Sequence, residues 1–210
     1  MELLRSIRTN TLGISIFAVV TAGLIAVTQA STRDTIIENE RAQRAAALYE
    51  IIPASAVDSD LLKHTVTLPA QELGYTQAEI YQAVKNSKVN AVIIPVIAAD
   101  GYSGDINLIV GVNADGSVAG VRVLSHKETP GLGDKIDLKK SKWILSFNGK
   151  QMQGSDDPLW AVKKDNGQFD QFTGATITPR AVVKAVGEAL QFFEKNKSSL
   201  LTLANGADAS

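Results

Sequence analysis

Small hydroxyl-bearing residues near the C-terminal end of the chain have the types and spacing to hold a phosphate. The segment Asp170–Pro179 reads Asp-Gln-Phe-Thr-Gly-Ala-Thr-Ile-Thr-Pro. Thr178 is a suitable N-cap, and Pro179 fits the first position of a helix because its missing N–H needs no partner there. The N-terminus of that helix would direct free N–H groups and a partial positive charge at the threonines, a suitable seat for a phosphate. Ordinary helix capping explains the same residues, so the pattern alone leaves both interpretations open.

The same segment resembles the flavinylation motif of the FMN-binding domain family: an acidic residue, two further positions, then Ser or Thr, Gly, Ala and Thr. The resemblance implies that Thr176 carries FMN through a phosphoester bond. It also implies that the small residues before Thr176 leave room for a flavin transferase. Thr178 is a second hydroxyl within reach, so the choice of Thr176 follows from the family pattern and not from spacing. The other motif positions are filled by Asp170, Thr173, Gly174 and Ala175.

A second segment, Glu128-Thr129-Pro130-Gly131-Leu132-Gly133, also resembles this family, which has such a sequence after a β-hairpin. Taken alone, it is equally well a Pro-Gly turn that closes a strand. The resemblance implies that the turn lines the flavin pocket. Glu128 is then expected to hydrogen-bond the ribityl chain or the ring edge and to shift the flavin potential, without acting as a general acid or base. The residues expected at the pocket from this part of the chain are His126, Glu128, Thr129, Gly131 and Leu132.

The composition restricts the chemistry further. The chain has 210 residues, of which 45% are hydrophobic, enough for one ordinary domain and an appendage. It contains no cysteine, which excludes disulfides, Cys-ligated iron–sulfur clusters and Cys-type zinc sites within the chain. The only histidines are His64 and His126, in no paired motif, so we expect no metal site. The net charge is −1 and basic residues do not alternate with aromatics, so we expect no nucleic-acid partner.

An uncharged apolar run occupies residues 11–30 and follows a short polar N-terminus, residues 1–10. A run of about 20 such residues can cross a bilayer. A signal peptide ending at residue 30 is the alternative, but its apolar region usually has only about 7 to 15 residues. We therefore expect a retained single-pass anchor in a bacterial inner membrane. Arg5 and Arg8 favour a cytoplasmic N-terminus, which places the main domain in the periplasm.

Residues 31–88 are predicted to contain a connecting helix and the N-terminal part of the periplasmic domain. The helix has Thr32 as a cap, ends at Pro53, and is expected to continue from the membrane to the domain. Beyond it, we predict a short strand near His64–Leu68 and a helical turn around Thr76–Lys85.

A β-hairpin is the best-defined element in the remainder of the chain. From Ile106 to Val112 every second residue is a large apolar one, as in a strand with one buried face. Asp115-Gly116 then makes a turn, and Val118–Val123 forms the returning strand. Ala91–Ala99 is apolar enough for a buried strand, although Pro95 favours an edge or a bulge over a central position.

Residues 89–197 are predicted to form the FMN-binding domain, with a further strand at Pro158–Val162 and an amphipathic helix after Pro179. Residues 198–210 lose periodicity and are expected to be a flexible tail. The predicted fold class is α+β. It has a single N-terminal transmembrane helix and an extracytoplasmic FMN-binding domain, whose mainly antiparallel sheet is flanked by helices.

With its single anchor, the chain is similar to the G subunits of Rnf/Rsx-type ion-translocating electron transport complexes. This resemblance implies an electron-transfer subunit with covalent FMN that relays electrons between partner subunits and couples ferredoxin or NADH oxidoreduction to ion translocation. Such a redox subunit has no catalytic residues of its own and is not an enzyme alone. The implied partners are the other subunits, the membrane and a flavin transferase. The alternatives are the C subunit of a sodium-pumping NADH:quinone reductase, a membrane-anchored domain that binds a ligand non-covalently, and an assembly factor.

Overall fold

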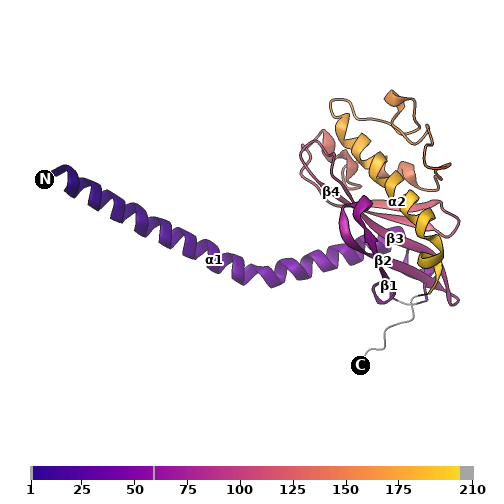
Figure 1. The fold of residues 1–210 in the computed structure, drawn as a ribbon, viewed down its shortest axis with the longest axis horizontal. Coiled ribbons are helices and arrows are strands. Elements are labelled where there is room, and N and C mark those ends of the chain that lie inside the picture. Colours follow the sequence, from indigo (N-terminus) through magenta and orange to yellow (C-terminus); the bar gives the residue numbers. More distant parts are fainter. Residues whose placement is uncertain (1, 59, 204–210) are drawn as a thin grey trace. The chain divides into compact units, whose positions relative to one another are not determined.

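The computed structural model describes residues 2–58 and 60–203, which form two compact units divided after Gln43. A single long helix, α1 (Glu2–Ile51), begins the chain, and its last turns belong to the second unit (Figure 1). The predicted connecting helix is therefore continuous with the apolar helix before it. Thr32 does not cap a helix as predicted, because its Oγ1 donates to the carbonyl oxygen of Thr28 at 2.9 Å, inside α1.

The apolar part of α1 has the length and composition of a membrane span. Asn10–Arg33 is a 24-residue stretch with a mean hydropathy of 2.1, and its most apolar window is not buried against other parts of the protein. It contains the predicted span, residues 11–30. Large apolar side chains such as Ile14 and Phe17 are exposed along it. A bilayer would remove this apolar surface from water.

The second unit contains one five-stranded antiparallel sheet with the strands in sequence order. The strands are β1 (Thr65–Ala70), β2 (Tyr75–Lys85), β3 (Lys88–Ala98), β4 (Ile106–Asn113) and β5 (Val118–Ser125). The predicted hairpin is confirmed as β4 and β5, and Gly116 in its turn has a φ of +90°, which favours glycine. The predicted antiparallel sheet is confirmed as well.

Three of the predicted elements differ from the structure. Residues 76–85 do not form a helical turn but belong to β2, which pairs with both β1 and β3. The strand that contains Pro95 is central, yet β3 pairs with β2 only as far as Ile93, so Pro95 has a strand partner on the β4 side alone. Residues 158–162 form no strand, and Val162 makes only an isolated bridge to Phe169.

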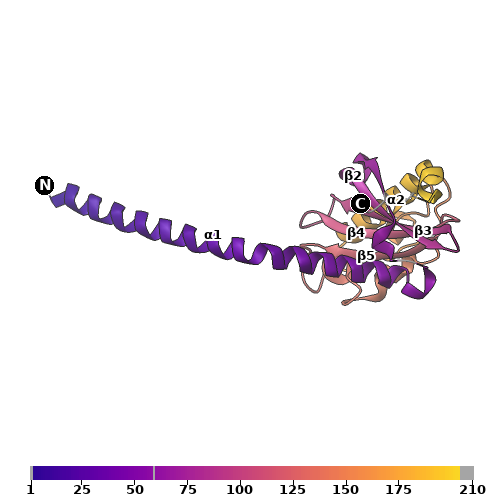
Figure 2. The same ribbon diagram turned by 90° about the horizontal axis from the view of Figure 1, so that it is seen from below.

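Each face of the sheet packs against a different helix. Helix α2 (Ile177–Leu201) crosses the sheet in Figure 1 and packs on the face that presents alternate strand residues, including Val92, Ile94 and Val110. On the opposite face, the last turn of α1 packs against the strand residues that alternate with these, such as Ile93 and Ile109 (Figure 2). The two-residue period of a strand explains this division. The apolar face predicted for α2 is confirmed by the burial of Val182, Val186, Ala189 and Phe193.

Two glycines allow the end of α1 to pack closely against the sheet. Gly111 of β4 lies opposite Gly120 of β5. A Cβ at Gly120 would lie 3.3 Å from Cγ2 of Ile51, and a Cβ at Gly111 would overlap the same atom. The adjacent Glu50 Oε2 pairs with Arg122 Nε at 2.7 Å. The helix end is therefore fixed to the sheet by shape and by an ion pair.

Short 3₁₀ helices and turns complete the described part of the domain, with three of these helices before β2 and three between β5 and α2. Their aromatic residues form a buried cluster in which Phe147 stacks on Phe169 with ring centroids 4.4 Å apart. Trp160 Nε1 donates to the Val183 carbonyl oxygen at 2.9 Å and so ties this region to α2. The 3₁₀ helices are Ala54–Ala56, Leu61–Lys63, Gln71–Leu73, Gly133–Ile136, Lys142–Phe147 and Lys163–Asp165.

Candidate functional site

One cavity joins the two motif segments that the sequence places some 40 residues apart along the chain. Its volume is about 430 Å³, within the range of small-molecule sites. The β3–β4 loop, the segment after β5 and the beginning of α2 each contribute to its wall. The lining residues are Tyr102, Glu128, Thr129, Leu132, Gly133, Gly174, Ala175, Thr176, Ile177 and Thr178.

The loop before α2 is a tight turn with a buried anchor. Ala175 N–H donates to the Phe172 carbonyl oxygen at 3.2 Å, and Gly174 adopts a φ of +83° between them. A positive φ at this position is typical of a type II turn and is easiest for glycine. Phe172 is buried and packs edge-on against Trp143, whose Nε1 donates to the Asp170 carbonyl oxygen at 2.7 Å. Phe172 and Trp143 therefore anchor the turn to the core of the domain.

Helix α2 begins at Ile177, so the prediction that Thr178 caps it was wrong. Thr176 occupies the N-cap position, and its side chain makes no capping hydrogen bond. Thr178 is fully buried inside the first turn, where its hydroxyl donates to Glu128 Oε2 instead. Pro179 follows within the first turn, where a missing N–H is tolerated. The two threonine hydroxyls of the cavity thus differ, because that of Thr178 is already engaged by a carboxylate.

Glu128 is the centre of the buried polar contacts in this region. Only 4% of its surface is exposed, and its Oε1 accepts the Ser103 N–H at 2.9 Å while Oε2 accepts the Thr178 hydroxyl. A Cβ at Gly133 would lie 2.8 Å from Glu128 Oε2 and 2.9 Å from Thr178 Oγ1. Glycine is therefore required beside this pair. Through Glu128, three distant segments of the chain are held around one cavity.

The segment after β5 is a compact turn that presents Thr129 and Leu132. The Thr129 carbonyl oxygen accepts the N–H groups of Leu132 at 3.2 Å and Gly133 at 3.1 Å. Asp134, which is buried, accepts the Gly131 N–H at 2.8 Å through its Oδ1. The Pro-Gly turn predicted from the sequence is thus present, and it also forms part of the cavity wall.

The structure brings together most of the predicted site residues. Seven line the cavity: Glu128, Thr129, Leu132, Gly174, Ala175, Thr176 and Thr178. Four do not, namely His126, Gly131, Asp170 and Thr173. His126 contacts a lining residue, since its Nδ1 accepts the Glu128 N–H at 3.1 Å. Asp170 is exposed and pairs with Lys163 Nζ at 2.6 Å.

Sequence reasoning missed Tyr102, Gly133, Ile177 and the backbone contribution of Ser103. Gly133 ends the segment Glu128–Gly133, which resembles the family, so the sequence could have identified it as a site residue. Ser103 contributes only an N–H group, for which no side-chain pattern exists. Tyr102 is 68% exposed, and the only available signal was a large aromatic residue in a turn.

The cavity wall carries negative but not positive side-chain charge among the residues described. Glu128 is the one ionisable carboxylate of the lining, and no Lys or Arg lies in it. The basic residues at the start of α2 have other partners: Arg180 Nε lies 2.6 Å from Asp165 Oδ2, and Lys184 Nζ lies 2.5 Å from Asp100 Oδ2. Hydrogen bonds from Arg180 hold the pKa of Asp165 below its ordinary value, and the hydrogen bond to Asp100 raises the pKa of Lys184.

Comparison with known proteins relates the chain to two family models and to proteins of known name. Residues 101–191 match the FMN-binding domain family, and residues 1–51 match the RnfG N-terminal region. The G subunit of the ion-translocating oxidoreductase complex of Vibrio atlanticus (strain LGP32) is 50% identical over 200 residues, covering 95% of this chain and 96% of that protein. The protein of the same name from Aliivibrio fischeri (strain MJ11) is 46% identical over 203 residues, covering 96% and 97%.

The chain belongs to the family of G subunits of the ion-translocating oxidoreductase complex.

The family assignment bears directly on the cavity. Every lining residue, from Tyr102 to Thr178, falls within the FMN-binding domain match of this G-subunit family member. The expectation of FMN is confirmed at the level of the domain. The predicted G-subunit resemblance is confirmed too, and the alternative of a C subunit of a sodium-pumping NADH:quinone reductase finds no support.

Proposed function

We propose that this chain is the electron-transfer subunit of a membrane-bound ion-translocating oxidoreductase complex and carries FMN covalently on Thr176. The flavin relays electrons between partner subunits and so contributes to coupling ferredoxin or NADH oxidation to ion movement. The observation that carries the proposal is the cavity itself. It joins both motif segments inside an FMN-binding domain and has the Thr176 hydroxyl at the N-terminus of α2.

The hydrogen bonds of the cavity favour Thr176 over Thr178 as the attachment point. Thr178 is fully buried and donates its hydroxyl to Glu128. Thr176 is half-buried and has no capping bond to give up. A transferase must reach the acceptor oxygen, and the exposed Gly174 beside it adds no side chain to the approach.

Charge favours a covalent ester over free FMN. A free FMN phosphate carries close to two negative charges at neutral pH, whereas the phosphodiester to Thr176 carries one. The described lining residues include no Lys or Arg, so the phosphate would rely on the N–H groups and partial positive charge at the start of α2. That environment suits one negative charge better than two. A tether also prevents loss of the cofactor into a dilute compartment.

Attachment is a phosphoryl transfer that we expect a separate flavin transferase to catalyse with FAD and Mg²⁺. The Thr176 oxygen forms a bond to the phosphorus of the FMN half of FAD. The pyrophosphate bond breaks, AMP leaves with its electron pair, and the hydroxyl proton passes to solvent or to a base of the transferase. No oxidation or reduction occurs, so no further reactant is needed.

The remaining predicted site residues have supporting roles in this proposal. Thr129, Leu132 and Ala175 contact the bound flavin from the cavity wall. His126 and Gly131 hold the segment after β5 in its turn through the hydrogen bonds described above. Asp170 and Thr173 belong to the exposed part of the attachment loop and are accessible to the transferase.

We also propose that the apolar stretch of α1 anchors the chain in the bacterial inner membrane. Residues 1–10 lie in the cytoplasm, residues 11–30 span the bilayer, and the domain carrying FMN lies in the periplasm. Arg5 and Arg8 before the span support this orientation. The other subunits of the complex are then reached from the membrane and from its periplasmic face.

In-gel fluorescence tests the attachment. Wild type, Thr176→Ala and Thr178→Ala are each co-expressed with a flavin transferase, denatured, and examined under ultraviolet light. The proposal predicts a fluorescent band for wild type and none for Thr176→Ala, with Thr178→Ala as the hydroxyl-removing control that keeps at least part of the signal. A dark wild-type band would contradict covalent attachment; flavin bound only in the native protein would then indicate non-covalent binding.

A further inference from the structure

Glu128 is a buried carboxylate with only neutral hydrogen-bond donors. The Ser103 N–H and the Thr178 hydroxyl contact its two oxygens, and no described basic side chain lies within ion-pair distance. Placing a carboxylate out of water without a cation is costly, and such groups are often functional. The buried polar side chains among the described residues are Gln82, Glu128, Asp134 and Thr178, three of which belong to this region.

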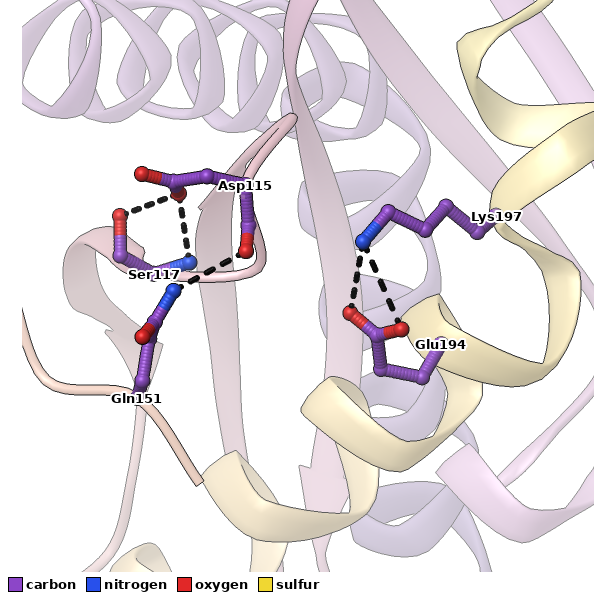
Figure 3. A network of polar contacts seen from close by, with 5 residues as sticks. All are labelled: Asp115, Ser117, Gln151, Glu194 and Lys197. Carbon is purple, nitrogen blue, oxygen red and sulfur yellow. Dashed lines mark hydrogen bonds and ion pairs between the residues drawn. The ribbon is translucent and has the colours of Figure 1, made fainter. Parts of the chain in front are cut away.

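Another cavity of the domain shows how exposed carboxylates are held. A second cavity, of about 560 Å³, includes Asp115 and Glu194 in its lining. Glu194 is exposed and pairs with Lys197 Nζ at 3.1 Å, and Asp115 accepts the Ser117 hydroxyl at 2.7 Å (Figure 3). Both carboxylates are exposed, and Glu194 also pairs with a lysine. Glu128 has neither advantage, although it lines the cavity assigned to FMN.

We propose that Glu128 sets the reduction potential of the bound flavin and holds it at a more negative value. This inference rests on the proposed function, since it concerns the cofactor of the same site. Reduction adds electrons to the flavin ring, and a fixed negative charge in the same cavity makes that addition less favourable. Because the Glu128 side chain is only 4% exposed, its charge is screened by water less than a charge at the surface would be.

The shape of the site does not require a charge at this position. Glutamine has nearly the same shape as glutamate and can accept the Thr178 hydroxyl through its amide oxygen. Glu128→Gln therefore removes the charge while keeping a bond that joins two walls of the cavity. A role confined to holding the walls together would leave the flavin potential unchanged.

The experiment is a spectroelectrochemical titration of the flavin absorbance in the full-length, flavin-loaded chain in detergent. We expect Glu128→Gln to have a more positive midpoint potential than wild type, and Glu128→Asp, which keeps the charge, to remain closer to wild type. Glu194→Gln is the matched control, because it makes the same chemical change at an exposed glutamate in the other cavity. A loaded Glu128→Gln whose potential equals that of Glu194→Gln would overturn the inference.

A second variant covers the case in which Glu128→Gln does not load flavin. Thr129 is exposed and lines the cavity, so Thr129→Lys adds a cation near an intact Glu128. The potential should again shift to more positive values, and an unchanged potential would contradict the inference. Loading is read beforehand from in-gel fluorescence. A dark wild-type band refutes the proposed function, whereas equal potentials in loaded proteins refute only the role of Glu128.

Discussion

At the scale of single residues, the site depends on a few close approaches that allow no extra atoms. Gly133 packs directly against the Glu128–Thr178 contact, and a methyl group at position 133 would not fit there. The same contact engages the hydroxyl of Thr178, the second threonine of the cavity. In the proposed attachment to Thr176, this one buried pair would therefore serve both the shape of the cavity and the choice of acceptor.

Gly133→Ala should therefore damage the site. The added Cβ would lie 2.8 Å from Glu128 Oε2, and overpacking of this kind costs about 1 to 3 kcal/mol. We expect a lower melting temperature and reduced covalent flavin, measured by circular dichroism and in-gel fluorescence. Gly23→Ala in α1, where a Cβ meets nothing within 4 Å, is the control. Normal stability and loading in Gly133→Ala would argue against a rigid Glu128–Thr178 contact.

The ion pair between Asp165 and Arg180 gives a pH-dependent prediction. Arg180 lowers the pKa of Asp165 in the folded protein, so the pair contributes stability above the ordinary carboxylate pKa of about 4. That contribution is lost as the pH falls through the lowered value. The stability difference between wild type and Asp165→Asn should thus be present at pH 7 and vanish at low pH, as urea unfolding would show. A difference independent of pH would contradict this origin.

At the scale of elements, the two helices on opposite faces of the sheet have different tasks. Helix α2 buries its apolar face and directs its N-terminus at the cavity. The end of α1 occupies the notch left by Gly111 and Gly120. The sheet therefore lies between α2, whose first residues line the cavity, and the last turn of α1.

The notch can be tested by a double-mutant cycle. Gly111→Ala places a Cβ onto Ile51 and should destabilise the domain by about 1 to 3 kcal/mol. Ile51→Ala alone leaves a cavity and should cost about 2 to 5 kcal/mol. The double variant should be more stable than the sum of the two changes predicts, because the clash is removed. Strict additivity in chemical denaturation would show that the two positions do not meet.

Local patterns predicted some elements well and others poorly. The β4–β5 hairpin has alternation and an Asp-Gly turn in adjacent residues, so both signals were available in one short window. Residues 76–85 include Gln, Ala, Glu and Lys, which do not favour strands, and pairing with strands on both sides decides their conformation. Thr178 has the sequence context of a cap, but its partner Glu128 lies 50 residues away. A contact between residues so far apart in the sequence produces no pattern in a short sequence window.

At the scale of the whole molecule, the domain begins before the point that the motifs indicate. β1 and β2 precede residue 89 yet belong to the same sheet as the hairpin, and the compact unit starts at Arg44. The motif residues lie only in the second half of the chain, and β1 and β2 lie within residues 31–88, where the N-terminal part of the domain is predicted. The last turns of α1 are part of the folded domain.

Truncation tests this boundary. A chain beginning at Arg44 keeps Leu48 and Ile51 in their cluster and should fold, remain soluble and accept flavin without the membrane span. A chain beginning at Ala54 loses these side chains and exposes Ile93 and Ile109, so we expect lower stability and aggregation. Size-exclusion chromatography and thermal unfolding distinguish the two. Equal behaviour would mean that the end of α1 is dispensable for the domain.

The most direct test of the central claim is fragmentation mass spectrometry of the purified wild-type chain after co-expression with a flavin transferase. The account predicts a peptide heavier by one FMN less one water, with fragment ions that place the addition on Thr176. An addition on Thr178 would contradict the proposed use of the two hydroxyls. An unmodified peptide, from a preparation in which the transferase is shown to be active, would contradict covalent flavin altogether.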